Sequence, residues 1–239
     1  MNSNLEQYIN NSYKHKHQDW HLGDAPFKAQ DIMPGLLAAI KASNKNSIRI
    51  ADIGAGAGGV LIEVIKLLNQ AKASIEIEAI GFEVSPQAVE ISRQQFPQLQ
   101  MRQKFFEISD GPFDIILFVD VLEHVENPWE MLRLARKSSD FITVRQPLLE
   151  NFSTFRHRNY EGQRNEWGHI GFFNYYSFLD MTNACGWKPL EITLAAQWEL
   201  AANINRSGSI LHRALVNTNR IITSYLISGF YLNGTFENA

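Results

Sequence analysis

The residues best suited to ligand chemistry lie in a glycine-rich stretch that follows a short apolar run. Glycines at such a turn let the backbone approach a ligand closely and let the following helix pack tightly on the strand. Gly54, Gly56 and Gly59 also match the G-x-G-x-x-G spacing of dinucleotide-binding turns. The pattern therefore predicts a cofactor site where a strand turns into a helix. The full stretch reads Asp52-Ile53-Gly54-Ala55-Gly56-Ala57-Gly58-Gly59.

Two acidic residues next to this turn indicate the charge of the ligand. Asp52 stands two positions before Gly54, where a carboxylate would repel a pyrophosphate but attract an ammonium or sulfonium group. S-adenosylmethionine (SAM) carries both of these cations and no phosphate, whereas NAD carries a pyrophosphate. Glu83 ends the next predicted strand and is suited to accept hydrogen bonds from ribose hydroxyls. The charges favour SAM, and NAD stays open as the alternative.

A scaffold that positions these residues is visible from about residue 47 onward, where strand-like and helix-like runs alternate. This alternation is typical of a parallel sheet covered by helices, so the predicted class is α/β. Phe113–Val119 is an almost continuous apolar run, as expected of a central strand buried on both faces. Other strands are predicted at 47–53, 75–82, 99–106, 141–144 and 187–194, with a last strand within 225–232. Helices are predicted at 29–42, 60–68, 87–95, 129–137, 175–185 and about 210–225.

Two segments do not follow the alternation. Residues 1–45 begin polar and continue as a helix, so we expect an N-terminal helical cover in front of a domain at 46–239. Residues 146–174 are rich in aromatic and basic side chains and lack helical periodicity, so we expect a long loop that lines the acceptor side of the site.

Composition limits the class of protein. The chain has 239 residues, 45% of them hydrophobic, which is enough for one well-filled core. A formal net charge of -3 gives no field for a polyanion, so general nucleic-acid binding is not expected. A single cysteine, Cys185, excludes an internal disulfide. The sequence shows no signal-peptide pattern, and the uncharged run after Arg220 is shorter than the roughly 20 apolar residues of a membrane span. We expect a cytoplasmic protein that does not span a membrane.

Three stretches, taken in order, resemble the successive motifs of class I SAM-dependent methyltransferases. The closest likeness is to the group that includes ubiquinone-biosynthesis-type small-molecule methyltransferases. The resemblance implies a seven-stranded, mostly parallel, Rossmann-like sheet with SAM bound across the carboxyl ends of its first strands. The three stretches are Ile50–Gly58, Gly81–Ser85 and Phe113–Pro128, and Gly168–Phe173 resembles an element before the family's last helix.

The resemblance also implies roles for individual residues around SAM. The glycines would pass under the methionine and ribose, Asp52 would support the loop or the amino group, and Glu83 would hold the ribose. Phe106 or Glu107 would contact the adenine, and both lie in a stretch that is shorter than usual for the family. From its charge alone, Lys28 could pair with the SAM carboxylate. The complete predicted cofactor set is Lys28, Asp52, Gly54, Gly56, Gly58, Glu83, Phe106, Glu107, Asp120 and Val121.

Methyl transfer from sulfur is an in-line displacement, so holding the nucleophile close to the methyl carbon can supply most of the catalysis. A histidine can take the proton of a hydroxyl acceptor, and His124 and His169 are the two candidates, each with a structural role as the alternative. The Lys14–His17 run lacks carboxylate or thiolate partners, so no metal is expected. The candidate acceptor-binding residues are Arg156, Arg158, Tyr160 and Trp167, which suit a planar, glycosidic or anionic molecule.

The predicted function is methyl transfer from SAM to a small-molecule acceptor, with oxygen slightly favoured as the acceptor atom. Two other classes stay open at this point. One is a SAM-binding module without catalysis that acts through partners, and the other is an NAD-dependent oxidoreductase. The apolar face of the C-terminal helix serves either a homodimer contact or the core, and the sequence does not decide between these.

Overall fold

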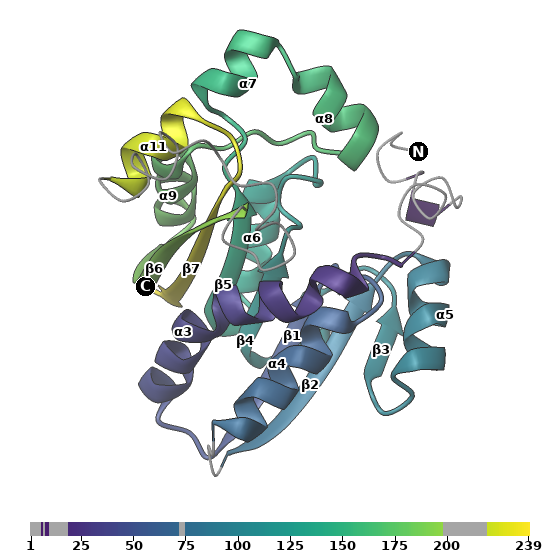
Figure 1. Cartoon of the computed structure of the whole chain (residues 1–239). Coiled ribbons are helices and arrows are strands. Elements are labelled where there is room, and N and C mark those ends of the chain that lie inside the picture. Colours follow the sequence, from purple (N-terminus) through teal and green to yellow (C-terminus); the bar gives the residue numbers. More distant parts are fainter. Residues whose placement is uncertain (1–5, 7, 10–18, 72–74, 198–218) are drawn as a thin grey trace.

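The computed structural model describes residues 6, 8–9, 19–71, 75–197 and 219–239. In this part of the chain, seven strands form one sheet in the order β3-β2-β1-β4-β5-β7-β6 (Figure 1). The neighbouring pairs from β3 to β5 are parallel, and β7 pairs antiparallel with β5 and β6. The α/β class and the mostly parallel, seven-stranded Rossmann-like sheet are therefore confirmed.

Helices follow most of the strands, as the alternation in the sequence predicts. The strands are β1 (Ser47–Ile53), β2 (Glu76–Glu83), β3 (Gln100–Gln103), β4 (Phe113–Val119), β5 (Ser139–Pro147), β6 (Trp187–Ala196) and β7 (Phe230–Asn238). The α-helices are α3 (Ala25–Ser43), α4 (Gly59–Gln70), α5 (Pro86–Gln95), α6 (Pro128–Arg136), α7 (Phe152–His157), α8 (Tyr160–Trp167), α9 (Tyr175–Ala184) and α11 (Arg220–Leu226). The described residues also contain two 3-10 turns, η1 (Leu22–Asp24) and η2 (Ile108–Asp110).

The sheet is buried on both faces, which explains the apolar run of its central strand. In β4, Ile115 and Leu117 face one core, which contains α3 and α4. Ile116 and Phe118 face a second core, which contains α6 and α9. Figure 1 shows α3 and α4 side by side across one face of the sheet. Because both faces are covered, functional side chains must gather at the ends of the strands.

The segment 146–174 is not the loop that the sequence predicts. It begins with the last residues of β5 and then forms the two short helices α7 and α8, which lie beyond the carboxyl edge of the sheet (Figure 1). The Asn151 side chain starts α7 by accepting a hydrogen bond from the Thr154 backbone at 2.9 Å, and Gly168 ends α8 with a φ of 80°. Neither helix has an apolar stripe, so periodicity could not reveal them.

Within the described residues, the predicted C-terminal helix is present at 220–225, and the predicted bounds of the last strand are wrong. Residues 210–218 of the predicted helix lie outside the described residues. Helix α11 begins after Asn219, whose extended backbone and side-chain bond to the Ile222 N–H at 3.0 Å mark a helix start. The last strand, β7, also extends well past the predicted 225–232 range.

At the N-terminal side, helix α3 packs against α4 and against β5, β6 and β7. The described part of residues 1–45 is therefore attached to the body of the sheet, while the division into a cover and a domain at residue 46 stays a prediction. None of the helices in the described residues combines the length and the apolar character that crossing a membrane requires.

Candidate active site

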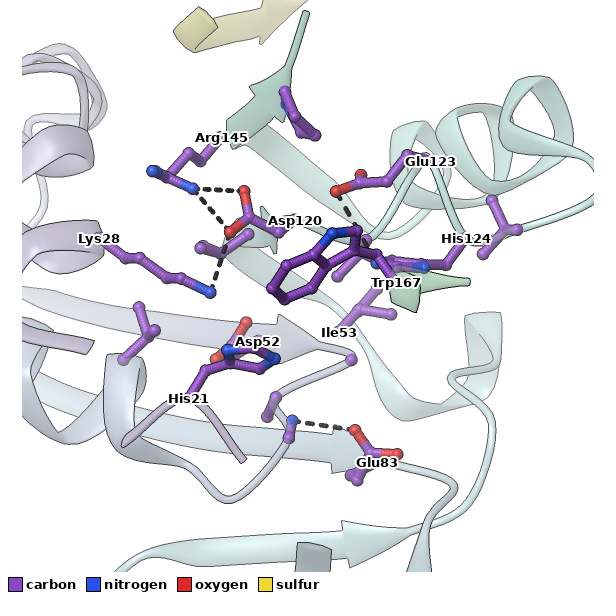
Figure 2. Close-up of a pocket in the computed structure, with 18 of the residues that line it drawn as sticks. His21, Lys28, Asp52, Ile53, Glu83, Asp120, Glu123, His124, Arg145 and Trp167 are labelled. Carbon is purple, nitrogen blue, oxygen red and sulfur yellow. Dashed lines mark hydrogen bonds and ion pairs between the residues drawn. The ribbon is translucent and has the colours of Figure 1, made fainter. Parts of the chain in front are cut away.

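A cavity of about 840 Å³ lies at the carboxyl ends of β1, β2 and β4. This volume falls in the upper part of the range of about 300–1,000 Å³ that small-molecule sites occupy. The glycine turn after β1, the end of β2, the segment after β4 and the end of α8 form its walls. The sheet edge therefore collects the candidate residues around one space (Figure 2).

The glycine turn is built for close approach of a ligand. Gly54, Gly56 and Gly58 have φ values of 72°, 54° and 80°, a region that favours glycine. A Cβ on Gly54 would lie 2.8 Å from a methyl group of Val121, which brings the segment after β4 against the turn. At Gly56, the nearest atom to such a Cβ is a Trp20 ring carbon at 4.0 Å, so this glycine faces open space. Gly54 and Gly56 line the cavity, whereas Gly58 packs against Leu99 and begins α4.

Glu83 connects the glycine turn to helix α5. Its Oε2 accepts a hydrogen bond from the Gly56 backbone N–H at 2.9 Å, and its Oε1 accepts one from the Ser85 N–H at 2.7 Å. Burial raises the pKa of Glu83, and these backbone donors oppose that rise. The carboxylate is thus fixed in position at the edge of the cavity, where the sequence predicts a ribose contact.

Asp52 is a buried carboxyl group in the same wall. Burial, with a further contribution from the negative charge of Glu83, raises the pKa of Asp52 to about 8, and Lys28 opposes the shift. Lys28 itself pairs with Asp120 at 3.0 Å. A cationic ligand beside Asp52 would favour its ionised form, so this wall suits a positively charged ligand that displaces the proton of Asp52.

A buried network of charges supports the segment after β4 (Figure 2). Arg145 Nη1 donates to both carboxylate oxygens of Asp120 at 2.6 Å, and Arg145 Nε donates to Asp31 at 3.0 Å. Burial alone would raise the pKa of Asp120, but Arg145 and Lys28 outweigh it and lower that pKa. The Arg145 guanidinium also lies 3.6 Å from the ring centre of Tyr231. This network fixes Asp120, whose φ of 54° is strained for a residue other than glycine.

Three side chains gather on the other side of the cavity. Glu123 and His124 follow β4, and His169 follows α8. The two imidazole rings lie 4.9 Å apart between centroids, and His124 Nε2 is 3.8 Å from Glu123 Oε1. Burial lowers the pKa of His124 to about 4, and burial together with His124 lowers the pKa of His169 to about 3. Both rings are therefore neutral near pH 7.

The structure brings some predicted residues to the cavity and leaves others away from it. The predicted residues in its wall are Lys28, Asp52, Gly54, Gly56, Glu83, Phe106, Asp120, Val121, His124, Trp167 and His169. Glu107 instead pairs with Lys104 at 3.0 Å and caps η2. Arg156 and Arg158 are exposed at the end of α7, and Tyr160 packs its ring on Phe172. Of the four predicted acceptor residues, Trp167 alone belongs to the described cavity wall.

Three important residues were missed by sequence reasoning. Glu123 stands next to His124 in a stretch already singled out, but nothing in the sequence indicated its burial. Arg145 offered a signal, since this charge directly follows the strand-like run Phe141–Val144. Asp31 lies on the predicted helix of the N-terminal region, where an acidic residue is normally solvated.

Comparisons with known proteins identify the class. The plantazolicin methyltransferase BpumL, crystallised with a monoazolic desmethylPZN analog and S-adenosylhomocysteine (SAH), is 12% identical; the match covers 99% of this chain and 94% of that one, with a TM-score of 0.63. The magnesium protoporphyrin IX methyltransferase of Synechocystis, crystallised with SAM, is 10% identical, with 88% and 79% coverage and a TM-score of 0.53. The shared fold is that of class I SAM-dependent methyltransferases. No curated protein sequence matches the chain.

The family follows from the sequence match. A model of the methyltransferase domain matches residues 28–192, which is more than half of the chain. The chain therefore belongs to the methyltransferase domain family. The predictions of a class I SAM-dependent methyltransferase and of SAM as its cofactor are confirmed. A strand order with an antiparallel β7 between β5 and β6 also differs from the 3-2-1-4-5-6 order of the usual dinucleotide-binding fold.

Proposed function

We propose that the protein transfers the methyl group of SAM to a small-molecule acceptor, most readily to an acceptor oxygen. The observation that carries this proposal is one cavity with two chemically different sides. Asp52, Gly56 and Glu83 on one side suit a cationic cofactor with ribose hydroxyls. Glu123, His124 and His169 on the other side offer acceptors for the hydrogens of a second molecule.

We assign the cofactor contacts by charge and position. Glu83 holds the ribose hydroxyls, because its carboxylate is already fixed by Gly56 and Ser85. Asp52 faces the methionine amino group or the sulfonium charge. Phe106, buried in the wall beside Phe82 with 5.2 Å between ring centroids, packs on the adenine. Lys28 contributes through Asp120, with which it is paired, more than through the SAM carboxylate.

His124 serves as a positioning residue for the acceptor. A base with a pKa near 4 takes a proton poorly at neutral pH, so general-base catalysis by His124 alone contributes little. Its neutral ring can still accept or donate a hydrogen bond and thereby orient an acceptor hydroxyl. Trp167, whose ring lies 6.0 Å from that of His21, closes the acceptor side as an aromatic wall.

Calorimetry with SAH tests the cofactor half of this proposal. We expect Glu83→Gln to weaken SAH binding at least about tenfold, because the amide replaces a charged acceptor of ribose hydrogen bonds. Glu76→Gln is the matched control, since Glu76 is exposed at the opposite end of the same strand. Equal affinity of wild type and Glu83→Gln would contradict the assignment of Glu83.

Methyl transfer itself is measured as SAH release from SAM in the presence of hydroxylated aromatic and glycosidic acceptors. We expect turnover with at least one class of hydroxyl acceptor, and lower turnover in the Glu83→Gln variant at cofactor concentrations that saturate only the wild type. SAH binding without methyl transfer to any acceptor would instead support a SAM-binding module that acts through partners.

A further inference from the structure

The cluster of Glu123, His124 and His169 has the composition of a metal site. One ligand atom from each residue can be chosen so that all three lie within 4.8 Å of one another. The three residues come from two segments, the turn after β4 and the segment after α8, and all three line the cavity. Backbone contacts hold these segments together, since the Glu123 carbonyl accepts hydrogen bonds from the Ile170 and Gly171 N–H groups at 2.8 Å.

Each of the two histidines has an oxygen acceptor beside its Nδ1 atom. His124 Nδ1 lies 3.2 Å from the Gly168 carbonyl oxygen, and His169 Nδ1 lies 2.9 Å from Gln163 Oε1. Because an amide oxygen can only accept, His169 Nδ1 carries the hydrogen and His169 Nε2 carries the lone pair. His124 Nδ1 also lies 3.0 Å from the Tyr8 hydroxyl, which can donate or accept, and the tautomer with hydrogen on Nδ1 bonds the Gly168 carbonyl and leaves the His124 Nε2 lone pair for a ligand. Histidines that bind metals show this arrangement, in which the outer nitrogen donates to a carbonyl and the inner one ligates.

Glu123 supplies a buried carboxyl group with one oxygen that has no hydrogen-bond partner among the described residues. Its side chain is 0% exposed, and Oε2 accepts a hydrogen bond from Gln146 Nε2 at 3.3 Å. Its Oε1 has no hydrogen-bond partner among the described residues and points toward His124 Nε2, 3.8 Å away (Figure 2). The nearby cations Lys28 and Arg145 are both engaged by Asp120. A buried carboxylate oxygen in this state is costly unless a cation approaches it.

We propose that Glu123, His124 and His169 bind a divalent first-row transition cation, such as Zn²⁺ or Mn²⁺. Two imidazole nitrogens and one carboxylate oxygen suit these ions better than Mg²⁺ or Ca²⁺, which prefer oxygen ligands alone. A cation bound at about 2.0–2.2 Å from each ligand needs ligand atoms roughly 3–3.5 Å apart, so binding would draw the three ligand atoms together from their spacing of up to 4.8 Å. The site revises the sequence-based expectation that no metal is required.

A cation bound at this site would also determine the class of methyl acceptor, and this inference rests on the proposed function. Three protein ligands leave coordination positions open toward the cavity, where an acceptor hydroxyl can bind. The bound hydroxyl loses its proton to water, because a cation lowers the pKa of a coordinated hydroxyl. Its oxygen then bonds to the methyl carbon as the carbon–sulfur bond breaks, and the products are a methyl ether, SAH and one proton. The acceptor class is therefore a molecule with a metal-binding hydroxyl group.

Titration of the metal-free protein with Zn²⁺ and with Mn²⁺, each alone, tests the site by calorimetry. We expect one strong equivalent in the wild type and weaker binding of Mg²⁺. Glu123→Gln and His169→Gln should weaken binding at least about 100-fold, because each removes one of three ligands. The matched controls are Glu161→Gln and His157→Asn, two exposed residues of the same kinds on α8 and α7. A His15→Gln/His17→Gln background removes the other two closely spaced histidines of the sequence.

Thermal unfolding separates a metal ligand from a structural role. Glu123→Gln keeps the size of the side chain and an oxygen that can accept the hydrogen bond from Gln146, so the metal-free variant should melt close to the metal-free wild type. Added Zn²⁺ or Mn²⁺ should raise the melting temperature of the wild type and leave that of Glu123→Gln unchanged. Metal affinity that persists in Glu123→Gln and in His169→Gln would overturn the proposal. SAH binding, measured on the same samples, shows that the variants are folded and reports on the proposed function separately.

Discussion

At the scale of single residues, two carboxyl groups of the cavity wall differ in charge because their neighbours differ. Asp120 is held between Arg145 and Lys28, so its pKa is lowered and it stays ionised. Asp52 is more deeply buried, Glu83 adds to the effect of burial and Lys28 is its main opposing charge, so its pKa rises to about 8. At neutral pH the cofactor-free protein therefore holds a proton on Asp52.

This proton gives a prediction for SAM binding. A cationic group placed beside Asp52 favours the carboxylate, so we expect binding at pH 7 to release up to one proton. Calorimetry in two buffers with different ionisation enthalpies, such as phosphate and Tris, measures the release. Asp52→Asn should show the same binding enthalpy in both buffers. A wild-type enthalpy that does not depend on the buffer would contradict a protonated Asp52 beside the cofactor.

The same group affects the stability of the cofactor-free protein. Because the pKa of Asp52 in the folded state lies above the unfolded value near 4, the folded protein binds more protons between about pH 4 and pH 8. The contribution of Asp52 is thus complete below about pH 4 and is lost as the pH rises toward 8. Denaturant unfolding should show this loss in wild type and a flatter profile in Asp52→Asn.

The sequence predicted which acidic residues reach the cavity better than it predicted the charged groups with which they interact. The positions of Asp52 and Glu83 follow from the ends of two strands, so both reach the cavity as predicted. Their electrostatic states do not follow from position, because they depend on Lys28 and Arg145, which come from distant parts of the chain. For the same reason, the sequence could not indicate that Arg156 and Arg158 lie away from the wall while Glu123 faces it.

At the scale of elements, apolar periodicity identified the helices and strands of the two cores. It failed where packing does not require an apolar face, as in the polar helices α7 and α8. The predicted ends of strands are wrong where polar residues also pair with a neighbouring strand. In β5, for example, the strand extends through Arg145 to Pro147. Close packing between elements was also beyond prediction, and Gly35 is the clearest example.

Gly35 lies where helix α3 crosses strand β7. An added Cβ would come within 2.2 Å of Thr235 Oγ1 and 3.0 Å of Thr235 Cβ. We expect Gly35→Ala to lower the free energy of unfolding by about 1–3 kcal/mol through overpacking, although alanine favours a helix by roughly 1 kcal/mol. Urea denaturation measures the change.

Gly162→Ala in α8 is the matched control, because it makes the same chemical change at an exposed helical position. There the nearest atom to the new methyl group is the end of the Asn159 side chain, which can swing away. We expect this variant to be as stable as the wild type or more stable. Equal stability of Gly35→Ala and Gly162→Ala would mean that α3 and β7 are less closely packed than described.

At the scale of the whole molecule, the resemblance of three short motifs predicted the sheet correctly because those motifs lie at the strand ends that define this fold. The order of the last two strands was not readable from the residues alone. Pairing of β7 between β5 and β6 depends on contacts with strands far away in the sequence, and the hydrophobic pattern of 225–239 is interrupted by Asn233 and Gly234.

The occupied cavity should stabilise the whole fold. At a concentration of 100 times its dissociation constant, a ligand adds about 2.7 kcal/mol. For a chain of this size that corresponds to a rise in melting temperature of roughly 5–10 °C. We expect SAH to produce such a rise and NADH to produce none, as measured by scanning calorimetry. A rise with NADH alone would favour the nicotinamide-dependent class.

The placement of β7 has a consequence for how the protein is made. Strand β6, which ends at Ala196, lies at the rim of the sheet and is bonded there through β7, which begins only at Phe230. Until β7 has been synthesised, β6 lacks the strand with which it pairs. The edge of β5 that pairs with β7 is also exposed during this time. Assembly of this half of the molecule must wait until synthesis reaches residue 238, so a nascent chain stalled earlier would present an unprotected strand edge to chaperones or to other copies of itself.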